Sequence, residues 1–326
     1  MMTYSQILRP CLGGMLIAIA SATQAVAQAP ASACSTVAYR GFDSRLQVEA
    51  VGRVVTQGER ITGFEMSNGR PVVAFERRLV AIDGERQFVM PSIDVIETLA
   101  VDAEGGLWIQ QGGRLRRVAK EKLETVRPLS AAVRLYNSGH TLFLESETQG
   151  NATRLTVRTA DERGALPPFH IEGGTAVAVS FSTLGIAAVV GDSLLAWSPG
   201  AKNVTTLRRD SGLRFARDVA LIAPQRAVIA LPNTLALITD RGATILAFLK
   251  ARVRWSNGAL YVLDEQWGLI WKLTGIEQIG TPGADKAHAT KLLKQLPQGA
   301  SETDVNFLEA ARLVGCEGAR GMRKKR

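Results

Sequence analysis

The sequence predicts an all-β fold, and three observations carry this prediction. Short runs rich in Val, Leu, Ile and Thr follow one another along the chain, and the 326 residues include 31 glycines. Asn-Gly pairs and other glycine-rich turns separate these runs, as tight hairpins require. A pattern of three strands and two turns recurs six times. The fold is therefore expected to consist of repeated small antiparallel sheets.

The repeat is clearest at the second strand of each unit. These strands are expected to begin near Arg70, Gly106, Thr141, Gly185, Arg226 and Ala259. An apolar strand and a turn precede each of them, and a third apolar strand follows. Their spacing gives units of about 40 residues, which is too short for a unit that buries both of its faces alone.

Four-stranded units of this length are typical of a β-propeller, in which each blade packs against the next around a channel. We expect six blades, with seven as the alternative, between residues 46 and 280. A ring must close, because open ends would expose unpaired strand edges. Leu46 to Val55 alternates like a strand and is expected to complete the last blade, although Ile276 to Ile279 competes for that position.

One turn resembles a known family of repeats. The segment Asp102-Ala103-Glu104-Gly105-Gly106-Leu107-Trp108 is similar to the D-x-x-G-x-L-W turn of the two-component-regulator and NHL-type propeller repeats, and Ser256 to Tyr261 repeats it more weakly. The other four units depart from this pattern. The resemblance is to the β-propeller superfamily and implies an architecture, not an activity.

The N-terminal segment has the features of a secretory signal peptide over residues 1–29. Arg9 precedes an apolar stretch from Cys11 to Ala20, and the pattern Ala25-Val26-Ala27 resembles a cleavage site. We expect cleavage after Ala27 or Ala29, a linker over residues 30–45, and a periplasmic or secreted protein. Lipidation at Cys34 is the alternative.

Two cysteines, Cys34 and Cys316, lie just outside the two ends of the repeat region. In an oxidising compartment they are expected to form a disulfide that ties the two ends of the chain together. The alternative is a pair of free thiols.

The C-terminal extension over residues 281–326 is expected to be helical. Pro282 and Gly283 suggest a linker, and Lys286 to Leu296 a short helix. Ser301 with Asp304 resembles the start of a second helix that Gly315 ends. The tail beyond is basic. Once Arg9 and the five basic residues of this tail are removed, the formal charge of +9 falls to +3. This predicts a solvated tail and no nucleic-acid partner, with attachment to an anionic surface as the alternative.

The sequence contains no pattern that predicts catalysis. Its three histidines, His140, His170 and His288, lack the spacing of a helical metal site. It has no Cys-x-x-Cys pair, no GxSxG motif and no phosphate-binding loop. We therefore expect no cofactor, no metal and no catalytic residue.

The candidate binding residues share one face of the expected ring. Loops from a fourth strand to the next first strand, and loops between second and third strands, open on the same face, and the resemblance implies that propellers commonly bind there. Arginines on it suit an anionic group. Trp267 follows a turn and is expected to be exposed. The candidates are Arg60, Asp94, Arg217, Asp218 and Arg252 in the first class of loops, and Arg77, Arg78, Arg114, Asp192, Asn233, Glu265 and Trp267 in the second.

Three functional hypotheses follow. The first is an exported scaffold, monomeric outside a complex and without a membrane-spanning segment, that binds an envelope protein or an anionic envelope component. The second is a lyase or hydrolase acting on an anionic glycan or lactone, with acid–base residues among Asp94, Asp218 and Glu265. The third is an immunity or inhibitor protein that blocks a periplasmic toxin.

Overall fold

The computed structural model describes residues 41–324 except 57, 85, 93, 102–104, 120–121, 129–133, 137–141, 150–151, 160–168, 173–175, 183, 199–200, 202 and 281. Its strands form six four-stranded antiparallel sheets. Within each sheet the paired strands are neighbours in sequence, apart from the one pairing that joins the two ends of the series.

Five sheets each consist of four consecutive strands. The first contains β2 (Ile61–Ser67), β3 (Arg70–Phe75), β4 (Arg78–Asp83) and β5 (Arg86–Pro91). The second contains β6 (Ile96–Val101), β7 (Leu107–Gln111), β8 (Arg114–Ala119) and β9 (Lys122–Pro128). The third contains β10 (Arg134–Tyr136), β11 (Leu142–Gln149), β12 (Ala152–Thr159) and β13 (Phe169–Glu172). The fourth contains β14 (Ala176–Ser182), β15 (Gly185–Val190), β16 (Ser193–Trp197) and β17 (Thr205–Arg209). The fifth contains β18 (Asp218–Ala223), β19 (Arg226–Leu231), β20 (Thr234–Thr239) and β21 (Gly242–Ala247).

The sixth sheet combines both ends of the strand series. It consists of β22 (Ala251–Ser256), β23 (Ala259–Asp264), β24 (Leu269–Thr274) and, on its outer side, β1 (Gln47–Arg53). The prediction that the segment beginning at Leu46 completes the last sheet is confirmed. The competing segment instead contains a short 3₁₀ helix, η3 (Ile276–Gln278).

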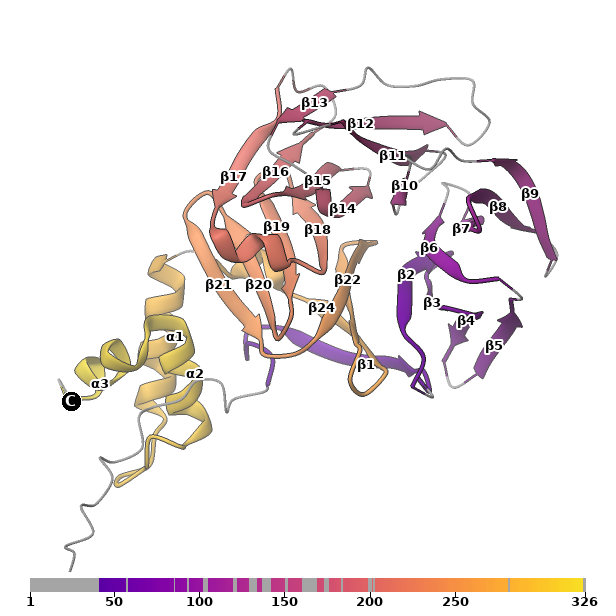
Figure 1. Cartoon of the computed structure of the whole chain (residues 1–326). Coiled ribbons are helices and arrows are strands. Elements are labelled where there is room, and N and C mark those ends of the chain that lie inside the picture. The colour runs from indigo at the N-terminus through magenta and orange to yellow at the C-terminus, as the bar shows by residue number, and fades with distance from the viewer. Residues whose placement is uncertain are drawn as a thin grey trace, which may run out of the picture. The chain divides into compact units, whose positions relative to one another are not determined.

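The six sheets are arranged in a ring (Figure 1). The first strand of each sheet contacts the first strand of the next, from β2 through β6, β10, β14, β18 and β22, and β22 contacts β2 again. This closed arrangement is a β-propeller, as the repeat predicts.

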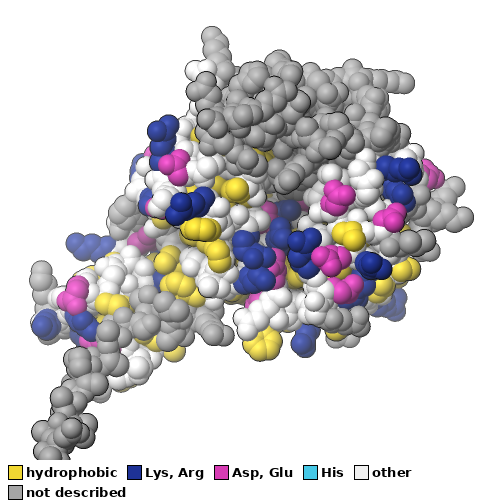
Figure 2. All heavy atoms as spheres, viewed as in Figure 1, with side chains coloured by type: hydrophobic (Ala, Val, Ile, Leu, Met, Phe, Trp, Pro, Cys, Tyr) yellow, Lys and Arg dark blue, Asp and Glu magenta, His cyan; other side chains and the backbone are white. Residues whose placement is uncertain are grey.

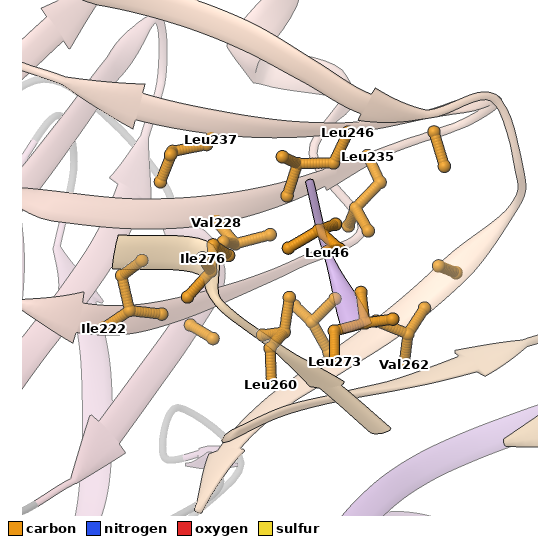
Figure 3. Packing of buried hydrophobic residues seen from close by; sticks show 14 of the residues in the cluster. Leu46, Ile222, Val228, Leu235, Leu237, Leu246, Leu260, Val262, Leu273 and Ile276 are labelled. Carbon is orange, nitrogen blue, oxygen red and sulfur yellow. The ribbon is translucent and has the colours of Figure 1, made fainter. Parts of the chain in front are cut away.

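The core lies between neighbouring sheets. β15 is buried along its whole length, and β19 and β23 are buried on both faces over most of theirs. Between the fifth and sixth sheets, Leu46 packs among Leu235, Leu246, Leu260 and Leu273 (Figure 3). Removing this apolar area from water joins sheets that are each too small to be stable alone.

The hairpin turns have the backbone conformation that their residues predict. Asn68 and Gly69 between β2 and β3 have φ values of 49° and 75°, and Asn257 and Gly258 between β22 and β23 have φ values of 50° and 74°. Two successive positive φ angles are the signature of the two-residue turn that matches the twist of paired strands.

Three helices follow the last sheet: α1 (Pro282–Lys294), α2 (Val305–Val314) and α3 (Cys316–Lys324). Three details of the prediction are wrong. Pro282 and Gly283 begin α1 instead of forming a linker, since proline is well tolerated in the first helical turn. Asp304, not Ser301, caps α2, because its side chain accepts a hydrogen bond from the Asn306 amide.

The third wrong detail is that the basic tail, expected to be solvated, is held by contacts of α3. Arg320 in α3 forms ion pairs with Glu302 and Glu317, and Arg323 donates a hydrogen bond to the Ala300 carbonyl. These contacts fix the helix against the loop before α2. Lys325 and Arg326 lie outside the described residues.

The helices are joined to the sheets by buried charges. Arg312 of α2 donates a hydrogen bond of 2.8 Å to the Leu246 carbonyl of β21 and lies 3.4 Å from the Asp43 carboxylate. Residues 41–45, predicted to be a linker, thus take part in a fixed contact. Among the described residues, no helix has both the length and the apolar character needed to cross a membrane.

Candidate functional site

The candidate site lies on the face where the loops between sheets open. We define the Glu265 face by eight residues of the first, fifth and sixth sheets and their loops, namely Val55, Arg214, Phe215, Arg217, Lys250, Arg252, Glu265 and Trp267. In Figure 2, Lys and Arg side chains gather toward the middle of the face that carries the short 3₁₀ helix η2 (Ser211–Phe215).

The centre of this face is one carboxylate surrounded by three cations. Glu265 forms ion pairs with Arg217 at 2.7 Å, Arg252 at 2.8 Å and Lys250 at 3.1 Å. The Glu265 side chain is 5% exposed, whereas those of Lys250 and Arg217 are 45% and 32% exposed. The cations therefore enclose the carboxylate and still present part of their surface to solvent.

These charges determine the protonation state of the site. Burial alone would raise the pKa of Glu265, but the positive charges of Arg252 and Arg217 outweigh burial, and the pKa is lowered. Glu265 is therefore ionised at neutral pH and is a poor proton donor. This arrangement suits anion binding better than acid catalysis.

Backbone contacts hold the cations in place. Arg252 donates hydrogen bonds of 3.4 and 3.3 Å to the carbonyls of Arg217 and Ile61, which precede β18 and begin β2. The Glu265 amide donates one of 2.9 Å to the Lys250 carbonyl. These hydrogen bonds link the face to the first, fifth and sixth sheets.

A second layer of charge lies beneath this surface. Arg254 on β22 forms ion pairs with Glu65 on β2 at 2.8 Å and with Asp218 on β18 at 2.7 Å. All three residues are buried. Asp218, a candidate binding residue, therefore lies below the face. Its carboxylate also accepts a hydrogen bond from the Val253 amide. Its role is to join the sheets.

Exposed apolar side chains border the cations. Phe215, Trp267 and Val55 are 57%, 55% and 56% exposed. The Arg214 guanidinium lies 4.9 Å from the centre of the Phe215 ring. The exposure of Trp267 is confirmed. Its turn is fixed, since Asp264 accepts the amides of Gln266 and Trp267. A Cβ at Gly268 would lie 2.0 Å from the Val54 carbonyl oxygen, so only glycine fits beside β1.

The other candidate residues lie outside this cluster. Arg60 pairs with Glu76 at 3.0 Å, Arg78 with Glu59, and Asp94 with Arg116 at 3.7 Å. Arg77, Arg114, Asp192 and Asn233 are exposed in or beside the turns between the second and third strands of the first, second, fourth and fifth sheets. The structure thus brings together Arg217, Arg252, Glu265 and Trp267, and the three candidate acids each have separate cation partners.

Sequence reasoning missed four members of the face: Val55, Arg214, Phe215 and Lys250. The signal that could have found Phe215 is its position in the run Arg214-Phe215-Ala216-Arg217, in a loop expected to be polar. Lys250 stands directly before β22, where the same loop rule that selected Arg252 applies.

A third charged group contains metal-binding residue types. One ligand atom each of Asp43, His288 and Glu309 lies within 4.8 Å of the others. Arg45 donates to Asp43 at 2.7 Å, and Arg312 lies 3.4 Å from both carboxylates. Two guanidiniums already neutralise these acids, so the residues fit an ion-pair network that fixes α1 and α2 better than a cation site.

The turns of the opposite face border a pocket of about 460 Å³ in the fifth sheet. Its wall includes Arg226, Asp240 and Arg241. Arg226 donates hydrogen bonds to the carbonyls of Ile276, Glu277 and Ile279 and so fixes the chain leaving the ring.

Comparison with known proteins gives similarity of fold alone. No protein-family model and no curated protein matches the chain. The β-propeller domain of Cps50 (Swd1) from Myceliophteria thermophila is 12% identical, with a TM-score of 0.47 over 66% of this chain and 82% of that one. A chain of the mitotic checkpoint complex is 11% identical, with a TM-score of 0.48 over 82% and 100%. U3-55K is 12% identical, with a TM-score of 0.46 over 72% and 100%.

Proposed function

We propose that the protein is an exported β-propeller that acts as a binding scaffold, and that the Glu265 face receives another protein of the cell envelope. The observation that carries this proposal is the arrangement of two exposed aromatic rings, Phe215 and Trp267, around a fixed cluster of cations. Aromatic residues and arginine dominate the binding energy of protein interfaces.

Export rests on the N-terminal segment. Its apolar stretch and the pattern Ala25-Val26-Ala27 have the order of a secretory signal. An anionic envelope component is the alternative ligand, because the cations of the face suit it as well.

The experiment compares capture of envelope proteins by the purified mature chain and by the double variant Phe215→Ala/Trp267→Ala. We expect the double variant to lose the partner that the unchanged protein retains, with a decrease of at least about tenfold. The control is Phe88→Ala/Val89→Ala, since these side chains of β5 are 55% and 52% exposed outside the face.

Equal recovery by Phe215→Ala/Trp267→Ala and by the unchanged protein would overturn the choice of face. Recovery of the chain only as an uncleaved precursor in the cytoplasm would overturn export.

A further inference from the structure

We infer that the partner presents an acidic polypeptide segment carrying at least one apolar side chain to the Glu265 face. This inference rests on the proposed function and adds the chemistry of the ligand.

The face has an excess of positive charge. Within the defined set, Arg217, Lys250 and Arg252 pair with the single acid, Glu265, and a fourth cation, Arg214, lies beside Phe215. Around it, ion pairs such as Arg78 with Glu59 and Arg60 with Glu76 balance each other. The uncompensated charge is therefore concentrated at the centre of the face, where it favours an anionic ligand.

The contacts of Glu265 show that these cations bind a carboxylate. Its two oxygens are divided, with Arg252 on one and both Arg217 and Lys250 on the other. The carboxylate binds from the buried side. Lys250 and Arg217 remain partly exposed, so a carboxylate arriving from solvent would share them with Glu265. Glu265 is thus both the residue that orders the cations and an internal competitor for the ligand.

The apolar residues favour a polypeptide over a glycan or a lipid surface. A sugar ring stacks on an open aromatic face, but the Phe215 ring already lies beside the Arg214 guanidinium and Val55 offers no ring, so Trp267 alone of the three exposed apolar residues would suit a glycan. Val55 follows β1 and Trp267 precedes Gly268, whose carbonyl accepts the Val54 amide at 2.8 Å, so these two residues are neighbours. Aliphatic and aromatic anchors beside separate cations match alternating apolar and acidic side chains.

The test begins with selection of random displayed peptides on the purified protein, with peptides that also bind Phe215→Ala/Trp267→Ala removed. We expect the enriched peptides to carry net negative charge and at least one large apolar residue. No enrichment, or enrichment of neutral or basic peptides, would overturn the inference.

Fluorescence anisotropy then measures the affinity of a synthetic acidic peptide of the selected type. Lys250→Glu should weaken binding by about tenfold or more, because it replaces attraction with repulsion. Glu265→Gln should strengthen it several-fold, because the competing charge is removed. The matched control is Arg241→Glu, a charge reversal on an exposed residue of the opposite face. Thermal unfolding of each variant verifies that it is folded.

Two further probes decide between ligand classes. Polygalacturonate and vesicles of phosphatidylglycerol should bind weakly and without dependence on Phe215. Tighter binding of either than of the peptide, or an unchanged affinity in Lys250→Glu, would overturn the inference. If Phe215 and Trp267 are needed to capture a partner that is not acidic, the proposed function stands and this inference alone fails.

Discussion

Asp43 shows how a single residue can join two parts of the chain. Its side chain is fully buried and accepts hydrogen bonds from Arg45, while Arg312 of α2 lies 3.4 Å away. Burial alone would raise the pKa of Asp43, but the hydrogen bonds from Arg45 and the two positive charges outweigh burial and lower it. The folded structure therefore stabilises the ionised Asp43 carboxylate, which the unfolded chain does not.

This difference predicts how stability depends on pH. A carboxyl group with a lowered pKa stabilises the fold above its unfolded value, and this contribution disappears as pH falls through the folded value. The ordinary value is 3.8, so we expect the free energy of unfolding to decrease steeply below about pH 4. Asp43→Asn should cost about 3 kcal/mol at neutral pH, because it removes the carboxylate that Arg45 and Arg312 share and leaves them only Asp285 and Glu309 as partners.

Urea denaturation at a series of pH values measures both effects. The difference between the unchanged protein and Asp43→Asn should narrow toward acid pH. The control is Asp240→Asn, an exposed aspartate with no ion pair among the residues that the structure describes. A constant difference from pH 7 to pH 3 would contradict the assignment.

Sequence reasoning placed some residues of the site correctly and not others. Arg217, Arg252 and Glu265 were expected on one face because loop order in a propeller determines which loops share it, and the structure brings them together. Asp218 follows Arg217 directly but lies beneath the surface. Strand alternation turns consecutive side chains to opposite sides, and the start of a strand cannot be located from sequence to within one residue.

At the scale of elements, two neighbouring sheets approach each other closely at Gly63. This residue of β2 faces β6, and a Cβ there would lie 2.7 Å from the Leu99 Cβ and 3.2 Å from the Leu99 amide nitrogen. Glycine permits these first strands to pack without a gap. The distance between blades in this part of the ring therefore depends on the absence of a side chain.

Gly63→Ala should consequently destabilise the protein. The added methyl group must displace β6, and such overpacking costs about 1–3 kcal/mol. The control is Gly283→Ala in α1, where a Cβ would contact nothing within 4 Å. This control should be neutral or stabilise the helix by up to about 1 kcal/mol. Equal stability of both variants in denaturant titrations would show that β6 moves at no cost.

Elements with local signals were predictable, and those that depend on distant contacts were not. The Asn-Gly turns supply their own positive φ angles, so β2–β3 and β22–β23 could be located from sequence. The start of α1 was misplaced because Pro282 and Gly283 read as a break. Whether such a pair ends an element or begins one depends on packing: α1 buries Ala289 and Leu293 against α2 and α3.

At the scale of the whole molecule, the order of the strands along the chain differs at one place from their order in the sheets. β1 pairs with β24, so that Gln47 lies opposite Thr274. This closure was predicted from the alternation of Leu46 to Val55 and from the cost of an open edge. The ring thus depends on a contact between segments more than 200 residues apart.

A disulfide between Cys34 and Cys316 would reinforce this closure. Cys316 begins α3 and packs against the apolar cluster of the helices, while Cys34 lies outside the described residues. The pairing stays a prediction. In the chain-entropy model, closing so long a loop stabilises the folded state by up to about 5 kcal/mol.

Peptide mapping under non-reducing conditions tests the bond directly. We expect one linked peptide pair containing Cys34 and Cys316, and a lower midpoint of denaturation after reduction. Cys316→Ser without reductant should match the reduced protein, and reductant should then have no further effect. Two free thiols in the oxidised protein would contradict the pairing.

The β1–β24 pairing also affects the order of events during synthesis. The ribosome makes β1 first, yet its partner strand is among the last parts of the ring to emerge. Until β24 is made, β1 and the edge of β23 carry unpaired backbone groups, which readily pair with other chains. A product that terminates before Leu269 would keep both edges open, so premature termination would yield an aggregation-prone chain instead of a smaller propeller.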